Sequence, residues 1–137
     1  MNVLQLVQQA AVRLQAAGVH FGHGTTNAAD EAAWLVLWRL GLPLNGLDEA
    51  AERAVTFEEG TQVDALIDER IRSRRPAAYL TGEAWLQGVA FYVDERVIVP
   101  RSLIAELLVE GGFDYWLSES THRVLDLCTG NGSLAVL

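Results

Sequence analysis

The clearest candidate for chemistry in this sequence is a hydrophobic run that breaks into glycines, VLDLCTGNG, at residues 124–132. Gly130 and Gly132 carry no side chain, so the backbone at these positions can turn sharply and lie directly against a ligand. The residues from Ser133 onward favour a helix, whose amino end would point at the same ligand. A strand, a glycine-rich turn and a helix in this order are typical of α/β domains that bind nucleoside cofactors.

The acidic residue inside the predicted strand narrows the choice of cofactor. Asp126 lies four residues before Gly130, a position more typical of S-adenosylmethionine sites than of dinucleotide sites, which place their first glycine directly at the strand end. The stretch GNGSLA also fits the loose dinucleotide pattern GxGxxA, so a nicotinamide or flavin site stays open as an alternative. A merely tight joint between a strand and a helix is the third interpretation.

Composition and charge exclude several other classes of protein. The chain of 137 residues is 50% hydrophobic and 20% charged, which is typical of a folded domain rather than a disordered segment. Its net charge of −8 repels phosphate backbones and argues against direct nucleic-acid binding. The one cysteine, Cys128, excludes an internal disulfide and fits a reducing compartment, and we expect it to be a small apolar residue at the end of the buried strand. His20, His23 and His122 lack the spacing of a metal site, so no metal is expected.

The first 75 residues predict a bundle of about four helices. The first of these is amphipathic, which makes the amino-terminal segment neither a signal peptide nor a membrane span and predicts a cytoplasmic protein. Trp34 and Trp38 lie one helical turn apart and are expected in the core. Thr56, followed three residues later by Glu59, has the pattern of a capping box at the start of a further helix.

The pattern changes from helical to strand-like at Pro76. Hydrophobic residues then alternate with a period of two, and Gly82 and Gly88 interrupt them, which predicts a β-hairpin within residues 76–100. We expect Trp85, inside this hairpin, to be a core residue.

A short helix is expected after the hairpin. Ser102 can cap it, and its buried side would carry Ile104, Leu107 and Leu108. The fold class is therefore α+β, with a helical bundle at residues 1–75, a β-hairpin linker at 76–100, and at 101–137 the incomplete first strand, turn and helix of a Rossmann-like α/β domain.

Three sequence blocks carry a more specific signal. They are RRPAAYLTGEAWLQGVAFYVDERVIVPRS at residues 74–102, IAELL at 104–108 and RVLDLCTGNGSLA at 123–135. In this order they resemble the HemK-type family of protein glutamine methyltransferases. The resemblance begins near residue 70, and the preceding helical part fits the family in length and class. In that family a helical bundle, thought to bind the protein substrate, is joined by a β-hairpin to a seven-stranded Rossmann-like methyltransferase domain that binds S-adenosylmethionine.

The resemblance also implies a set of cofactor-binding residues. Asp126 would brace the cofactor loop from the strand, and the loop itself would consist of Cys128, Thr129, Gly130, Asn131 and Gly132. Arg101 lies where the hairpin returns to the catalytic domain. We expect Arg101 near the cofactor or at the entry to the site, with a simple salt bridge as the competing interpretation.

Two branches of the family differ in these blocks. The release-factor branch typically reads PRPxTE after the hairpin and DLGTGTG or DLGTGSG at the loop, whereas this chain reads PRSLIAELL and DLCTGNG. These departures resemble the ribosomal branch, which methylates a glutamine on the third protein of the large subunit. Asn131 replaces the serine or threonine expected in the middle of the loop, although its amide can still form hydrogen bonds. The expected partner is a ribosomal protein, with a release factor as the alternative.

The chemistry requires parts that this sequence does not contain. A glutamine amide nitrogen is a poor nucleophile because its lone pair is delocalised, so the enzyme must align it with the sulfonium methyl and stabilise the developing charge. In the family an Asn-Pro-Pro-Tyr loop does this, and the sequence has no such loop. We therefore expect the amino-terminal part of a longer enzyme, with no catalytic residues, an incomplete cofactor site and no activity of its own.

Other functions stay open beside this one. A nucleic-acid adenine methyltransferase shares the target loop but usually lacks the helical domain and hairpin, and a non-catalytic protein-interaction module is a further alternative. The only cluster of basic residues favours a solvated helix end, with a docking patch for ribosomal protein or RNA as the alternative. The cluster consists of Arg70, Arg72, Arg74 and Arg75.

Overall fold

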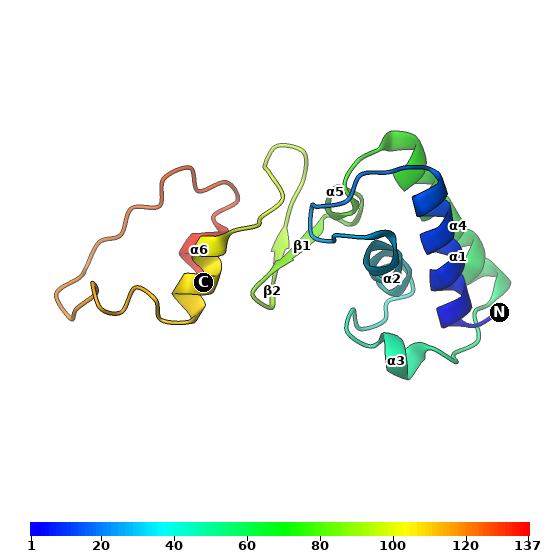
Figure 1. The fold of residues 1–137 in the computed structure, drawn as a ribbon, viewed down its shortest axis with the longest axis horizontal. Helices are drawn as coiled ribbons and strands as arrows, with labels where there is room; N and C mark the ends of the chain where they lie inside the picture. The colour runs from blue at the N-terminus through cyan, green and yellow to red at the C-terminus, as the bar shows by residue number, and fades with distance from the viewer. The chain divides into compact units, whose positions relative to one another are not determined.

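The computed structural model describes residues 1–137, which divide into two compact units at residues 1–81 and 82–137 (Figure 1). The first unit contains the helices α1 (Val3–Ala16), α2 (Ala28–Arg39), α3 (Leu47–Ala50), α4 (Phe57–Ser73) and α5 (Ala77–Thr81). The second contains the strands β1 (Glu83–Leu86) and β2 (Val89–Tyr92) and the helices α6 (Leu103–Val109) and α7 (Ser133–Val136). The predicted α+β class is confirmed. None of the helices combines the length and hydropathy needed to cross a bilayer.

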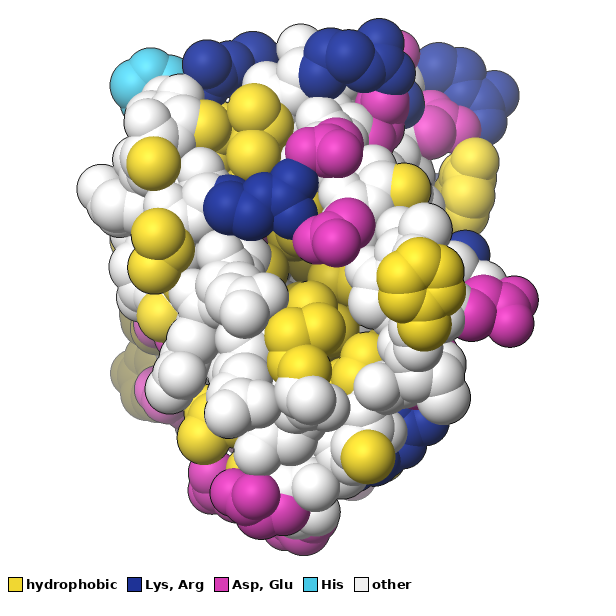
Figure 2. Space-filling model, turned by 90° about the vertical axis from the view of Figure 1, so that its right-hand side faces the viewer, with side chains coloured by type: hydrophobic (Ala, Val, Ile, Leu, Met, Phe, Trp, Pro, Cys, Tyr) yellow, Lys and Arg dark blue, Asp and Glu magenta, His cyan; other side chains and the backbone are white.

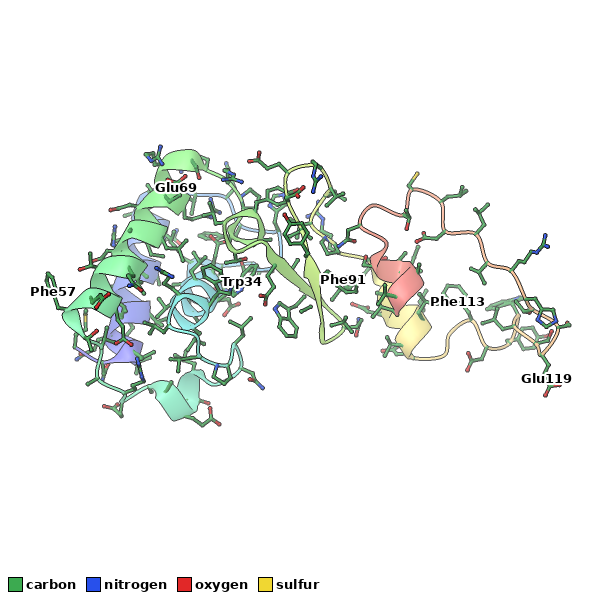
Figure 3. The ribbon with its side chains drawn as sticks, turned by 180° about the vertical axis from the view of Figure 1, so that it is seen from behind. Trp34, Phe57, Glu69, Phe91, Phe113 and Glu119 are labelled. Carbon is green, nitrogen blue, oxygen red and sulfur yellow. The ribbon has the colours of Figure 1, made fainter.

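The helical unit is built on contacts among α1, α2 and α4. Their apolar positions recur at helical spacing and form one buried cluster, to which the largest contributions are Leu6, Leu14, Leu35, Leu37 and Ile67. Trp34 of α2 packs against this cluster, whereas Phe57, the first residue of α4, projects into solvent (Figure 3). The predicted helical bundle is thus present, although its third helix is a single turn.

Side-chain caps fix where the three long helices begin. Asn2 forms a capping box with Gln5 at α1, and Asn27 accepts a hydrogen bond from the backbone of Asp30 at α2. At α4 the predicted capping box is confirmed. Thr56 Oγ1 accepts from the Glu59 backbone N–H at 3.2 Å, and Glu59 Oε2 accepts from the Thr56 backbone N–H at 2.9 Å. Each box satisfies backbone donors that the first turn of a helix leaves unpaired.

Glu59 is expected to make the start of α4 sensitive to acid. The side-chain hydrogen bond from Arg53, followed by the backbone hydrogen bond at Thr56, lowers the pKa of Glu59 below its ordinary value. A carboxyl group whose pKa is lower in the folded state stabilises the fold above its ordinary pKa and loses that contribution as the pH falls. We expect the urea midpoint of Glu59→Gln to lie below that of the wild type at pH 7, and the two to converge below about pH 4. A difference that does not change with pH would contradict this assignment.

The second unit begins with a tight antiparallel hairpin. β1 pairs with β2 in a register that runs from Glu83 opposite Tyr92 to Leu86 opposite Val89. Gln87 and Gly88 connect the strands with φ values of 50° and 77°, as a two-residue turn of the mirror-image type requires. Ala84 and Phe91 are buried.

The expectation that Trp85 is a core residue is wrong. Successive residues of a strand point to opposite faces, and Trp85 lies on the face opposite Ala84. Its side chain is 49% exposed, and its indole Nε1 donates to Glu83 Oε1 at 2.6 Å.

The rest of the second unit leaves apolar side chains uncovered. Ser102 caps α6 as predicted, because its hydroxyl accepts from the Ile104 backbone N–H at 3.1 Å. The expected buried side of α6 is wrong, however, since Ile104, Leu107 and Leu108 are exposed and Ala105 is the buried residue of the helix.

Residues 124–127, expected as the first strand of the α/β sheet, form no strand. Val124 is 84% exposed. A parallel strand exists only through hydrogen bonds to its neighbours, and the sheet of this structure consists of β1 and β2 alone. The expected turn and helix, by contrast, are present at residues 128–136.

Candidate functional site

Residues 126–133 form a compact turn that leads into α7. Thr129 Oγ1 donates to Asp126 Oδ2 at 2.8 Å, so the carboxylate of Asp126 is bonded to the turn that follows it. The Gly132 backbone N–H donates to the Thr129 carbonyl at 2.9 Å, and Asn131 Oδ1 accepts from the Ser133 backbone N–H at 3.3 Å. Side chains and backbone of the predicted cofactor loop therefore hold one another in a closed turn.

The backbone of this turn needs its glycines. Gly130 and Gly132 have φ values of 60° and 79°, in the left-handed region that residues with a side chain rarely adopt. A Cβ built on Gly132 would meet nothing within 4 Å, so this side of the turn is open to a ligand.

Cys128 also has a positive φ, 58°, and its free thiol is exposed. The expectation that it is a small apolar residue at a buried strand end is therefore wrong. The reason is that residues 124–127 have no strand beside them in this structure.

An open pocket of about 540 Å³ lies beside Asn131 in the second unit. Its lining consists of Phe91, Tyr92, Asp94, Arg96, Val97 and Asn131. The pocket thus joins one member of the predicted cofactor loop to the end of the hairpin. Asn131 Nδ2 is buried and has no hydrogen-bond partner. Arg101 is not among the lining residues and is exposed just before the cap of α6.

The charged side of this pocket is an ion pair that sequence reasoning did not single out. Arg96 Nη2 contacts Asp94 Oδ2 at 2.6 Å, and the Tyr92 hydroxyl donates to the same oxygen at 3.0 Å. Hydrogen bonds from the side chain and then the backbone of Arg96 hold the pKa of Asp94 well below its usual range. Asp94 is therefore a fixed anion at neutral pH rather than a proton carrier. The signal available in the sequence was the spacing DER directly after an alternating strand.

The basic cluster at the end of α4 is not uniformly solvated, which corrects the expectation for it. Arg70 is 2% exposed and lies in the core, where it pairs with Glu31, whereas Arg72 is exposed and contacts Glu69. Arg70 follows Ile67 by three residues, on the buried face of α4. That helical spacing was the signal that could have identified it from the sequence.

The turn and the pocket have the chemistry of a binding site. The Asp126 carboxylate, the open glycine backbone and the unpaired Nδ2 of Asn131 together suit the polar groups of a nucleoside ligand. Known proteins similar to this chain identify its family.

The model of the PrmC N-terminal domain matches residues 5–82, which is more than half of the chain. The chain therefore belongs to this family.

Three relatives of this chain share one name and one pattern of coverage. A ribosomal protein uL3 glutamine methyltransferase of Bordetella pertussis is 53% identical over 134 residues, which make up 96% of this chain and 45% of the relative. The proteins of the same name from Burkholderia pseudomallei and Neisseria meningitidis are 50% and 46% identical over 137 residues, again 45% of each relative. The chain thus spans less than half the length of these relatives. The resemblance to the HemK-type family is confirmed by these matches.

Proposed function

We propose that this chain is the amino-terminal part of an S-adenosylmethionine-dependent enzyme that methylates a glutamine side-chain amide of ribosomal protein uL3. The observation that carries the proposal is the extent of the similarity. It covers 99% of the chain in the Burkholderia pseudomallei protein and therefore includes the hairpin and the glycine turn as well as the helical unit. Ribosomal proteins are made in the cytoplasm, which is the compartment we propose for the enzyme.

The proposed division of labour follows the sequence. Residues 1–75 recognise the substrate, residues 76–100 form the linking hairpin, and residues 101–137 begin the methyltransferase domain. The uncovered apolar side chains of α6 and of residues 124–127 support this division, because they have the pattern of elements that are buried in a complete α/β sheet. In the longer enzyme the remaining strands would cover them.

The residues of the turn fit S-adenosylmethionine as the methyl donor. Asp126 and residues 129–132 would hold its polar groups, and the orphaned Nδ2 of Asn131 is a donor that a bound ligand would satisfy. When bound, the cofactor supplies an electrophilic methyl group on its sulfonium. In this proposal the part of this chain is to bind and orient the cofactor.

Methyl transfer by the full-length protein tests this function. We expect the full-length protein to add one methyl group, detected by mass spectrometry, to a glutamine of uL3 purified from cells that lack the enzyme. The same assay with a release factor as the acceptor should show little product. Methylation of the release factor or of DNA in place of uL3 would overturn the proposal.

Asp126 provides the test of the cofactor site. In the full-length enzyme, Asp126→Ala is expected to raise the KM for S-adenosylmethionine by about ten- to a hundredfold, as for loss of a charge-assisted hydrogen bond. Glu119→Ala is the matched control, since it removes an exposed carboxylate from the same unit. Equal KM values for the two variants would exclude Asp126 from the site.

A further inference from the structure

One buried ion pair ties the α1–α2 loop (residues 18–26) to the core of the helical unit. Arg70 of α4 and Glu31 of α2 are 2% and 3% exposed, and Arg70 Nε donates to Glu31 Oε1 at 2.7 Å. Each partner also forms a hydrogen bond to the loop through a second polar atom. Arg70 Nη2 donates to the His20 carbonyl at 2.8 Å, and Glu31 Oε2 accepts from the Thr25 hydroxyl at 3.0 Å. The pair therefore holds the loop near both of its ends.

This pair is a costly way to join two helices. Taking two charges out of water carries a penalty that their attraction often fails to recover, and apolar side chains of similar volume commonly stabilise a core as well. Arg70 Nη1 adds to the cost, because it is buried without a hydrogen-bond partner. Stability alone does not account for charged residues at both positions, and the further hydrogen bonds that the pair makes are with the loop.

The loop itself is built to hold one conformation. The Gly22 backbone N–H donates to the Thr25 carbonyl at 2.6 Å, which closes a turn inside the loop. Gly22 and Gly24 have φ values of 115° and 111°, which residues with a side chain avoid. At Gly24 an added Cβ would lie 3.4 Å from the Trp34 ring, so the backbone there passes close to α2.

The outward side of the loop adjoins cationic side chains at the end of α4. Arg74 Nη1 donates to the carbonyl of Ala17, the residue before the loop, at 2.8 Å, and Arg72, two positions before Arg74, is exposed. On the face shown in Figure 2, basic side chains and a histidine gather at the upper end with acidic side chains among them, and further acidic side chains gather at the lower end. The loop adds imidazole and hydroxyl groups from His20, His23 and Thr26, and the ring of Phe21, which is half-buried and packs against the core cluster.

We propose that the α1–α2 loop is a pre-formed docking element for the protein substrate and that Arg70 and Glu31 are its positioning residues. The inference rests on the proposed function. The occupant is a segment of uL3 that presents carboxylates or backbone carbonyls next to an apolar side chain, since the loop and Arg72 offer hydrogen-bond donors beside an aromatic ring. A loop already in its binding conformation loses little entropy on association, which strengthens binding without any new contact.

The test replaces the pair by apolar residues in the full-length enzyme. In Glu31→Leu/Arg70→Met we expect the thermal midpoint to be retained and the amides of residues 19–25 to lose protection from hydrogen exchange. The KM for uL3 should rise about tenfold, because ordering the backbone of even one more residue on binding costs about that factor in affinity. The kcat and the KM for S-adenosylmethionine should not change. If the pair of Arg70 and Glu31 had a purely structural role, the KM for uL3, the kcat and the KM for S-adenosylmethionine would change together.

Two further variants complete the experiment. Arg13→Met removes another arginine that links two helices, through Asp64 and Asp68, but touches no residue of the loop, and its KM for uL3 should equal that of the wild type. His20→Ala/Thr26→Ala alters exposed loop side chains without disturbing the core and should raise the KM for uL3; it decides the question if the apolar variant fails to fold.

The outcomes distinguish a failure of the docking inference from a failure of the proposed function. A freely exchanging loop with an unchanged KM for uL3 would overturn the inference, as would an unchanged KM in His20→Ala/Thr26→Ala. Loop protection that persists in the apolar variant would also overturn it, because the pair would then not hold the loop. Absence of uL3 methylation by the wild-type enzyme would instead overturn the proposed function.

Discussion

Replacing Arg70 alone by methionine is expected to destabilise the helical unit by about 3–5 kcal/mol, because the Glu31 carboxylate is then left buried without its partner. Small domains have about 5–15 kcal/mol of net stability, so the variant should be partly unfolded at moderate temperature. Urea denaturation of the 137-residue chain, followed by circular dichroism of its helices, measures the change in the free energy of unfolding.

Two further variants serve as controls for Arg70→Met. Arg13→Met breaks the contacts of Arg13 with Asp64 and Asp68, which are exposed, and should cost no more than about 1 kcal/mol. Adding Glu31→Leu to Arg70→Met should restore most of the lost stability, because the uncompensated charge is gone. A loss in Arg70→Met no larger than that in Arg13→Met would show that Glu31 reaches solvent or another partner.

Leu35→Ala is expected to lower the free energy of unfolding by about 2–5 kcal/mol. Leu35 is fully buried on α2, among the side chains that α1 and α4 contribute to the core. Removing most of its side chain loses the transfer free energy of the missing groups and leaves a cavity that helix packing can only partly close.

The matched control is Val12→Ala on α1, whose side chain is exposed. Its effect on the urea midpoint should stay within about 0.5 kcal/mol, as for most surface substitutions. Similar losses in the two variants would mean that α2 does not occupy the centre of the unit.

The helical unit could be predicted from the sequence because the signals for its helices lie within short stretches of the chain. The apolar spacing of α1, the Asn27 cap of α2 and the Thr56 capping box of α4 each concern residues within one or two turns of one another. The Arg70–Glu31 pair was missed because it joins residues 39 positions apart, and arginine is normally a surface residue. Arg70 has the helical spacing of the buried Val63 and Ile67, and this spacing rather than the residue type indicates its burial.

The second unit contains features that local sequence patterns could not predict. The hairpin and the turn at residues 128–132 were predictable, since both depend on short-range glycine geometry. The strand at residues 124–127 and the buried side of α6 were not realised, because their burial requires strands and helices from elsewhere in a sheet. The ion pair of Asp94 and Arg96 at the pocket belongs to no sequence motif described above.

The division of the chain into two units also affects the order in which its parts fold during synthesis. The core cluster of the helical unit is formed by residues 3–77, all of which are synthesised before the hairpin and the glycine turn. Domains generally fold as units from the amino-terminal end during synthesis. The α1–α2 loop can therefore reach its final shape on the nascent chain before translation ends, so the proposed docking surface would mature before the proposed cofactor site.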